Sequence, residues 1–274
     1  DTRGNQAQPL LISNKGRYVW CDEPFEFKFD GQRLTVQSDT GAIQFGKVGD
    51  SLRDAYRHVS RAYFPSTGEM PDEMLFVKPQ YNTWIELIYD QREDRIRRYA
   101  DDILANGFPA GVLMIDDNWQ EDYGVWEFHP GRFQDPKGMM HRLHDQGFKV
   151  MLWICPYFSP DCETFRLLNK KGYFLKDKRG GTYICRWWNG YSASLDLTNP
   201  EAVKYFQDRL TYLVDQYGVD GFKLDAGDAR AYKDPNIKAR EAISPNEFSE
   251  RWAALGLPFK LNEYRACWKL AGQP

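Results

Sequence analysis

The sequence of 274 residues has little of several residue types and patterns that mark particular functional classes. Its five cysteines are an odd number without a Cys-x-x-Cys pair, which argues against a zinc site or a dense disulfide framework. The longest apolar run, Val150–Cys155, is far shorter than the ~18–20 residues that span a bilayer, so we expect no membrane insertion. The first residues lack the apolar core of a secretory signal. The compartment therefore stays open, and a periplasmic or extracellular one fits if a signal has been removed.

Net charge and histidine spacing give no positive signal either. Lys and Arg number 36 against 39 Asp and Glu, and the net charge of −3 gives no electrostatic support for binding nucleic acid or an anionic membrane. The four histidines show no metal-ligand spacing, and the chain has neither a Gly-x-Ser-x-Gly elbow nor a glycine-rich phosphate loop. We therefore expect no cofactor and no nucleic-acid partner.

Aromatic residues, in contrast, are abundant, with nine Trp, 16 Tyr and 17 Phe. Most of these rings are expected in the core, where large aromatic side chains contribute most to packing. Some could instead form platforms for a sugar, whose C–H faces pack on aromatic rings. Composition alone favours the core, so the positions of the rings have to decide.

The N-terminal part, residues 1–78, is predicted to be β-rich and sandwich-like. Asp30-Gly31 is a strong hairpin signal that follows an alternating apolar segment. The predicted strands are Leu10–Ile12, Tyr18–Trp20, Phe25–Phe29 and Leu34–Val36.

From residue 79 to residue 274, strand and helix patterns alternate. The predicted strands are Thr83–Leu87, Gly111–Ile115, Lys149–Cys155, Val219–Leu224 and Phe259–Asn262. The predicted helices are Asp90–Asn106, Lys137–Gln146, Pro200–Gln216 and Asn246–Leu255. Apolar strands that alternate with helices predict an α/β fold, and long polar loops after the strands favour a (β/α)₈ TIM barrel over a doubly wound open sheet. Only about five of the eight barrel strands are present, so we interpret this part as a partial barrel.

Acidic residues follow three of the predicted strands: Asp116 and Asp117, Asp196, and Asp225. Asp225 ends one strand, and Lys223 shares its face and could keep the carboxylate ionised. An ionised Asp in that position suits nucleophilic attack on a sugar, but it could equally cap a following helix. Asp116 and Asp117 could bind sugar hydroxyls, hold a metal or cap a loop; no third metal ligand is evident, and the nearby Trp119 favours carbohydrate.

Several sequence blocks, in this order, resemble glycoside hydrolase family 31, a family of retaining, exo-acting α-glycosidases. They are Asp116-Asp-Asn-Trp119, Trp153-Ile-Cys-Pro156, Trp188-Asn-Gly190 followed by Asp196-Leu-Thr-Asn-Pro200, Phe222-Lys-Leu-Asp225, and Arg265 through Gly272-Gln273. The resemblance implies a β-sandwich followed by a (β/α)₈ catalytic barrel. The Arg-Trp-Trp-Asn-Gly and Lys-Leu-Asp-Ala-Gly-Asp segments resemble the branch that contains the myogenesis-regulating glycosidase and its bacterial relatives.

The resemblance also implies roles for individual residues. Asp225 matches the catalytic nucleophile, and the family's acid/base Asp would lie beyond Pro274. Asp116 matches the acid that binds sugar hydroxyls, and the remaining predicted substrate-binding residues are Asp117, Trp119, Trp153, Trp188, Lys223, Asp228 and Arg265. Asp196 and Glu263 are further acids that could support the site.

The sequence therefore predicts a retaining α-glycosidase that hydrolyses a terminal α-galactoside or α-glucoside through a covalent glycosyl-Asp intermediate. Its expected partner is a glycoside or oligosaccharide, and no metal is required. Three alternatives remain: an α-xylosidase of the same family, a non-catalytic carbohydrate-binding protein, and a metal-dependent hydrolase that uses Asp116 and Asp117.

Overall fold

The computed structural model describes residues 8–23, 25–39 and 41–265. The described chain divides into two compact units, one ending at Glu69 and the other beginning at Met70, and each is considered separately. The proposed division into domains at residues 78 and 79 stays a prediction.

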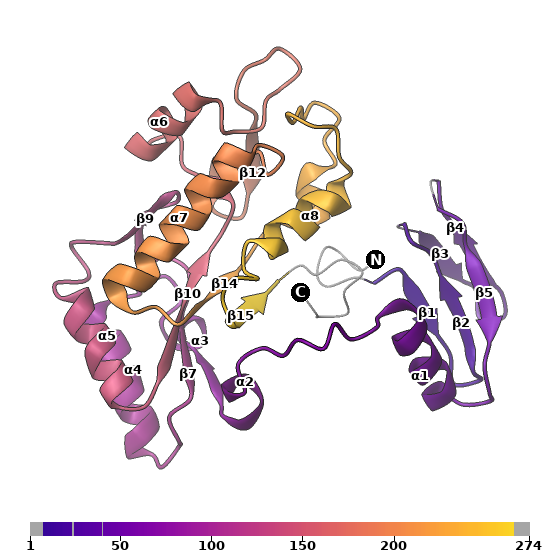
Figure 1. Ribbon diagram of the computed structural model, residues 1–274, viewed down its shortest axis with the longest axis horizontal. Coiled ribbons are helices and arrows are strands. Elements are labelled where there is room, and N and C mark those ends of the chain that lie inside the picture. The colour runs from indigo at the N-terminus through magenta and orange to yellow at the C-terminus, as the bar shows by residue number, and fades with distance from the viewer. Residues whose placement is uncertain (1–7, 24, 40, 266–274) are drawn as a thin grey trace. The chain divides into compact units, whose positions relative to one another are not determined.

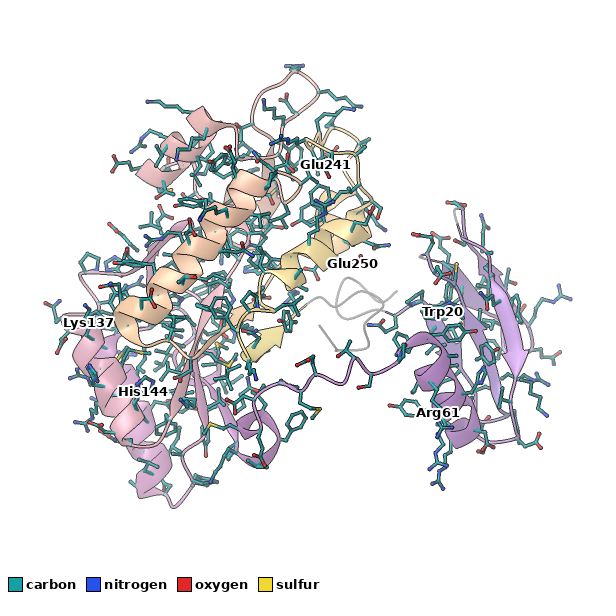
Figure 2. All side chains as sticks on the ribbon, viewed as in Figure 1. Trp20, Arg61, Lys137, His144, Glu241 and Glu250 are labelled. Carbon is teal, nitrogen blue, oxygen red and sulfur yellow. The ribbon has the colours of Figure 1, made fainter. Side chains whose placement is uncertain are left out.

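The first unit contains two small antiparallel sheets and one helix. Strands β1 (Leu10–Ile12), β2 (Arg17–Trp20) and β5 (Gln44–Lys47) form one sheet, and β3 (Glu26–Phe29) pairs with β4 (Leu34–Gln37) in the predicted hairpin. The unpredicted helix α1 (Leu52–Tyr63) begins at a capping box between Ser51 and Asp54. Trp20, labelled in Figure 2, stacks on Tyr63 with ring centroids 4.3 Å apart, which joins the sheet to the helix. The predicted β-rich character of this part is confirmed.

The second unit is built on a five-stranded parallel sheet. Its strands, in spatial order, are β6 (Gln80–Asn82), β7 (Val112–Ile115), β10 (Lys149–Ile154), β14 (Gly221–Leu224) and β15 (Leu261–Tyr264). Each strand pairs with the next strand of the core sheet along the chain. A doubly wound sheet reverses its strand order at a switch point, whereas a barrel keeps sequential order. The predicted partial TIM barrel is therefore confirmed.

The sheet is strongly curved. Gln80 on β6 donates a hydrogen bond from Nε2 to Oε2 of Glu263 on β15, at 3.0 Å. In a flat sheet of five strands the two outer strands would lie ~19 Å apart, because neighbouring strands are ~4.8 Å apart. Side chains of β6 and β15 can meet only because the strands curl around a common interior, as they do in a barrel.

The described residues of this unit also form helices. They are α2 (Met74–Val77), α3 (Thr83–Leu87), α4 (Glu93–Ala105), α5 (Pro136–Asp145), α6 (Glu163–Lys171), α7 (Pro200–Tyr217) and α8 (Pro245–Ala254), with a 3₁₀ turn at Ala229–Tyr232. Figure 1 shows α4 and α5 side by side along the sheet. The bounds of α7 follow from its ends, since Asn199 caps the first turn and Gly218 adopts a left-handed conformation after the last. Within the described part of the chain, no helix has the length and apolar character needed to cross a membrane.

One predicted strand is wrong. Residues Thr83–Leu87 form helix α3, and the first barrel strand is the preceding segment, β6. The side chain of Asn82 accepts a hydrogen bond from the backbone N–H of Trp84 at 2.8 Å, which starts the helix immediately after the strand. A strand of the barrel sheet would bury its apolar side chains, but Ile85 is 82% exposed. The fifth strand is also shifted, to Leu261–Tyr264.

The segments after β7 and β10 carry short strands of their own. Strands β8 (Gln120–Asp122) and β9 (Val125–Phe128) form a hairpin, and β11 (Tyr157–Phe158), β12 (Ile184–Trp187) and β13 (Gly190–Ser194) form a small antiparallel sheet. These elements follow the carboxyl ends of barrel strands, where the active sites of TIM-barrel enzymes lie.

Candidate active site

Asp225 lies directly after β14 and is held in a fixed orientation. One carboxylate oxygen, Oδ2, accepts a hydrogen bond from the indole Nε1 of Trp153 at 2.7 Å. The other, Oδ1, accepts from the backbone N–H of Ala226 at 2.8 Å. Asp225 is 8% exposed, and no α-helix begins at it, so it does not act as a helix cap. Ala226 has a φ of 56°, a strained conformation of the kind that gathers at functional sites.

Arg265 links two of the predicted acids. Its Nη1 lies 3.4 Å from Oδ1 of Asp225, and its Nε lies 3.3 Å from Oδ2 of Asp228. The second oxygen of Asp228, Oδ1, is buried without a hydrogen-bond partner among the described residues. Burial raises the pKa of Asp228, and the Arg265 guanidinium partly offsets this. The guanidinium therefore bridges the two carboxyl groups that follow β14.

Lys223 pairs with Asp116 rather than with Asp225. Its ammonium nitrogen lies 3.0 Å from Oδ2 of Asp116 and 3.6 Å from Oε1 of Glu263. Burial opposes the charged form of Lys223, but the two carboxylates outweigh burial and raise its pKa. Burial likewise raises the pKa of Glu263, against the pull of Lys223. Three strands, β7, β14 and β15, thus contribute to one buried ionic cluster.

Asp117 forms a second cluster with two residues of neighbouring loops. The hydroxyl of Tyr123 lies 3.0 Å from its Oδ1, and the Nδ2 of Asn189 lies 2.8 Å from its Oδ2. Asp117 is 3% exposed, and burial raises its pKa to about 6. Burial also raises the pKa of Tyr123, which keeps its hydroxyl protonated and able to donate.

The predicted tryptophans occupy different environments. Trp153 is buried with its indole N–H on Asp225, and Trp188 is 49% exposed with its ring 5.1 Å from the guanidinium carbon of Arg265. Trp119 has no exposed surface, and its indole N–H donates to the backbone carbonyl of Trp153 at 2.8 Å. Trp119 supports the site from within the core and offers no free face to a sugar.

The structure brings most of the predicted site residues together. Direct contacts connect Asp225 with Trp153 and Arg265, and Arg265 in turn with Asp228 and Trp188. Asp196 has a different task, since it accepts hydrogen bonds from the N–H and hydroxyl of Thr198 and from the N–H of Arg240. It fixes the loop before α7.

Tyr123 and Asn189 were not singled out by the sequence. Asn189 stands inside a block that carries the family resemblance, which was the available signal. Tyr123 had none beyond its place in an aromatic loop, because only folding brings it to Asp117.

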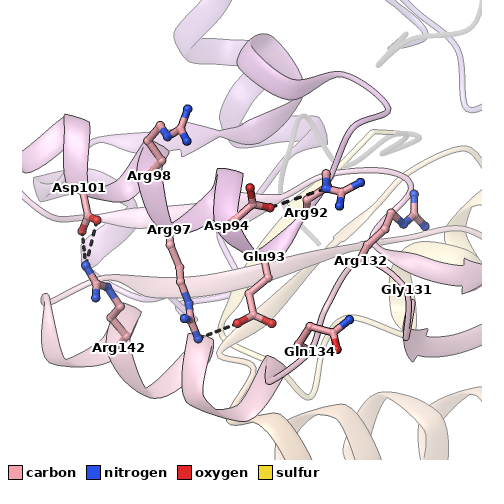
Figure 3. Close-up of a pocket in the computed structure, with 10 residues that line it drawn as sticks. All are labelled: Arg92, Glu93, Asp94, Arg97, Arg98, Asp101, Gly131, Arg132, Gln134 and Arg142. Carbon is pink, nitrogen blue, oxygen red and sulfur yellow. Dashed lines mark hydrogen bonds and ion pairs between the residues drawn. The ribbon is translucent and has the colours of Figure 1, made fainter.

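A separate cavity of about 610 Å³ lies along α4 and α5 and contains none of the predicted site residues. Five arginines line it, and acids of α4 pair with three of them: the dashed lines in Figure 3 join Arg92 to Asp94, Arg97 to Glu93 and Arg142 to Asp101. Among the described residues, no group of three or more His, Cys, Asp or Glu side chains is arranged to hold a metal ion.

Buried carboxylates and an indole at the carboxyl ends of sequentially ordered parallel strands define a TIM-barrel protein whose candidate site lies where barrel enzymes have theirs. The chain belongs to glycoside hydrolase family 31: the sequence profile described as "Glycosyl hydrolases family 31 TIM-barrel domain" matches residues 77–260.

Individual relatives agree with this assignment. The mouse myogenesis-regulating glycosidase is 30% identical over 213 residues, covering 77% of this chain and 30% of its own length. The α-xylosidase XylQ of Lactiplantibacillus pentosus is 28% identical over 255 residues, covering 87% of this chain and 31% of its own. Among solved structures, a Flavobacterium johnsoniae dextranase of the same family, complexed with glucose, superposes with a TM-score of 0.79 at 20% identity, covering 97% of this chain and 35% of that one. This chain spans about a third of the length of these proteins.

Proposed function

We propose that the protein is a retaining, exo-acting α-glycosidase that hydrolyses a terminal α-linked hexose, an α-galactoside or an α-glucoside. The observation that carries the proposal is the carboxylate of Asp225, held at the end of β14 by Trp153 and Arg265. A nucleophile needs a fixed direction of attack, and hydrogen bonds to both carboxylate oxygens supply one.

In the proposed reaction, an oxygen of Asp225 attacks the anomeric carbon as the bond to the leaving oxygen breaks. The leaving oxygen takes the bonding electron pair and a proton from an acid/base residue, which we expect from the family resemblance to be an Asp beyond Pro274. The same group then removes a proton from the water that releases the sugar. Asp116 binds sugar hydroxyls, and Trp188 offers the exposed ring for packing.

The charge balance of the site supports this chemistry. Five carboxyl groups (Asp116, Asp117, Asp225, Asp228 and Glu263) face only two cations, Lys223 and Arg265, in the contacts described above. The transition state of glycoside hydrolysis has oxocarbenium character, so positive charge develops on the sugar ring. A preorganised excess of carboxylate stabilises that charge.

The test is covalent trapping with 5-fluoro-α-D-glucosyl fluoride and its galactosyl and xylosyl counterparts. Fluoride leaves without protonation, so trapping requires the nucleophile but not the acid/base. We expect intact-protein mass spectrometry to show one added 5-fluoroglycosyl group, located by peptide mapping on Asp225 and absent in Asp225→Asn. No adduct with any of the three sugars, or an adduct that persists in Asp225→Asn, would refute the proposal.

The choice of sugar is decided by a second assay. The full-length protein is compared on 4-nitrophenyl α-galactoside, α-glucoside and α-xyloside. Preferred turnover of the xyloside would replace the proposed hexosidase with the α-xylosidase alternative. Sugar binding by calorimetry without turnover or trapping would favour a carbohydrate-binding protein instead.

A further inference from the structure

Adjacent residues at the tip of the β12–β13 hairpin contact two different charged groups of the site. Asn189 donates to Asp117 at 2.8 Å, and the ring of Trp188 lies 5.1 Å from the guanidinium carbon of Arg265. The hairpin is not part of the barrel sheet, and its tip residues Trp188 and Asn189 connect β12 directly to β13. An exposed two-residue turn is ordinarily mobile. The side-chain contacts of Trp188 and Asn189 therefore decide how firmly this turn is held.

The amide of Asn189 makes bonds to three separate segments. Its Nδ2 donates to Oδ2 of Asp117 and, at 2.6 Å, to the hydroxyl of Tyr123. Its Oδ1 accepts from the hydroxyl of Tyr89 at 3.1 Å. A side-chain amide has two N–H donors and one carbonyl acceptor, and in Asn189 both donors and the acceptor are used. The hairpin tip is thereby tied to the segments after α3 and β7 and to the turn between β8 and β9.

The consequence of this anchoring reaches Asp225 in two steps. Trp188 stacks on Arg265 in a cation–π contact, and the same guanidinium lies 3.4 Å from Oδ1 of Asp225. We infer that Asn189 is a positioning residue: it anchors the hairpin so that Trp188 holds Arg265, and Arg265 holds the Asp225 carboxylate, in the attacking orientation. This inference rests on the function proposed above.

The base of the hairpin is held by other contacts. β13 pairs with β11, and the indole of Trp187 donates to the hydroxyl of Ser192 at 3.0 Å. The Trp187 ring also packs on Tyr157, with centroids 4.6 Å apart. Loss of the Asn189 amide therefore frees the tip while the hairpin itself stays paired, and Asn189→Ala is expected to fold.

The first test measures how fast the fluorinated glycosyl fluoride that labels the wild type modifies Asp225. In Asn189→Ala we expect the limiting rate constant for labelling to fall by roughly 10- to 100-fold, because a misplacement of ~1 Å costs on the order of 10²-fold in rate. The concentration for half-maximal rate should change less. Tyr191→Phe is the matched control: Tyr191 is 64% exposed on the same hairpin, and its labelling rate should equal that of the wild type.

The second test is a pH profile of Asn189→Asp. This change places a second carboxyl group against Asp117, whose pKa burial has already raised to about 6. Asp117 also faces Asp116 with its partner Lys223, the hydroxyl of Tyr123, and the buried thiol of Cys155. Two adjacent carboxylates repel at neutral pH, but one shared proton lets them bond below the raised pKa. A second carboxylate in place of the Asn189 amide raises the pKa of Asp117 further. Labelling of Asn189→Asp, relative to wild type, should therefore recover as the pH falls from neutral, whereas Asn189→Ala should stay slow throughout.

The outcomes separate the inference from the function on which it rests. Labelling of wild type with an unchanged rate in Asn189→Ala would overturn the positioning role and leave the glycosidase proposal intact. Equal pH profiles for Asn189→Asp and Asn189→Ala would also overturn it, because a merely structural defect gives no rescue. Failure to label the wild type would instead overturn the proposed function, and the positioning role with it.

Discussion

Replacing Lys223 with Met removes the cation at the centre of a buried ionic cluster. The Lys223 side chain is 16% exposed and that of Asp116 only 4%, and they are 3.0 Å apart. Met retains the apolar stem but leaves Asp116 and Glu263 facing each other without a counter-ion. Removing one partner of a buried pair costs ~3–5 kcal/mol of unfolding free energy, because an uncompensated charge remains in the core. We expect about 3 kcal/mol, the lower end of that range, since Glu263 keeps 38% exposure and can rehydrate.

The pH dependence of this loss has a definite sign. Burial already raises the pKa of Glu263 above its ordinary value, and losing Lys223 raises it further. An acid whose pKa is higher in the folded than in the unfolded state costs stability at high pH, and that cost disappears as the acid protonates. The destabilisation by Lys223→Met should therefore be largest at pH 7 and shrink as the pH falls toward the ordinary Glu value.

The assay is urea unfolding followed by circular dichroism at pH 7 and at about pH 4.5, near the ordinary Glu pKa. A loss of about 3 kcal/mol corresponds to a fall in melting temperature of ~6–12 °C for a unit of this size. Lys204→Met is the matched control, because Lys204 pairs with Asp208 on α7 at 2.7 Å with both side chains more than 60% exposed. It should cost less than about 1 kcal/mol. Equal effects of the two substitutions, or a Lys223→Met loss that does not vary with pH, would refute the reasoning.

Three further predictions concern stability. Burial raises the pKa of Asp117 to about 6, so its contribution to the unfolding free energy should fall as the pH rises from about 4 to 6. This fall should be smaller in Asp117→Asn than in wild type, and parallel curves from urea titrations would contradict it. Asp220→Asn removes the charged acceptor shared by the Lys149 ammonium, the Nε2 of His144 and the backbone N–H of Val150, each 2.8 Å away, and should cost about 2 kcal/mol in the same titrations. In Gly221→Ala, the new Cβ would lie 1.5 Å from the backbone oxygen of Leu261, so β14 and β15 must separate. We expect a loss of about 3 kcal/mol or more in unfolding free energy. A melting temperature only 2–4 °C below that of wild type corresponds to a loss of ~1 kcal/mol and would contradict this prediction.

Much of the barrel could be predicted from local sequence patterns. The uninterrupted apolar residues of Val112–Ile115 and 150–154 are buried on both faces, as expected for parallel strands covered by helices. The start of α7 could also be predicted, because Asn is preferred as an N-cap and Pro in the first turn of a helix, as at Asn199 and Pro200. The long loops after the strands favoured a barrel, and the sequential order of the strands in the sheet agrees with that prediction.

Short segments were harder to predict. Residues Thr83–Leu87 were predicted as a strand, yet the cap from Asn82 makes them a helix. The direct partner of Lys223 was also hidden from the sequence: the charge of Asp225 does help to raise the Lys223 pKa, but the ammonium pairs with Asp116, which follows β7. A five-residue pattern contains too little periodicity to compete with one capping bond or one contact across the barrel.

By itself, the sequence determined which residues end the barrel strands, and hence that Asp116 and Asp225 stand where sites of this fold are built. Only the tertiary structure decided what each does there. Trp119 and Trp153 are both buried indoles, but one donates to a backbone carbonyl and the other to Asp225. Asn189 reaches Asp117 across 72 residues of chain. Periodicity fixes which face of an element is apolar, whereas the partner of a polar side chain depends on how separate elements pack, and no local pattern encodes that.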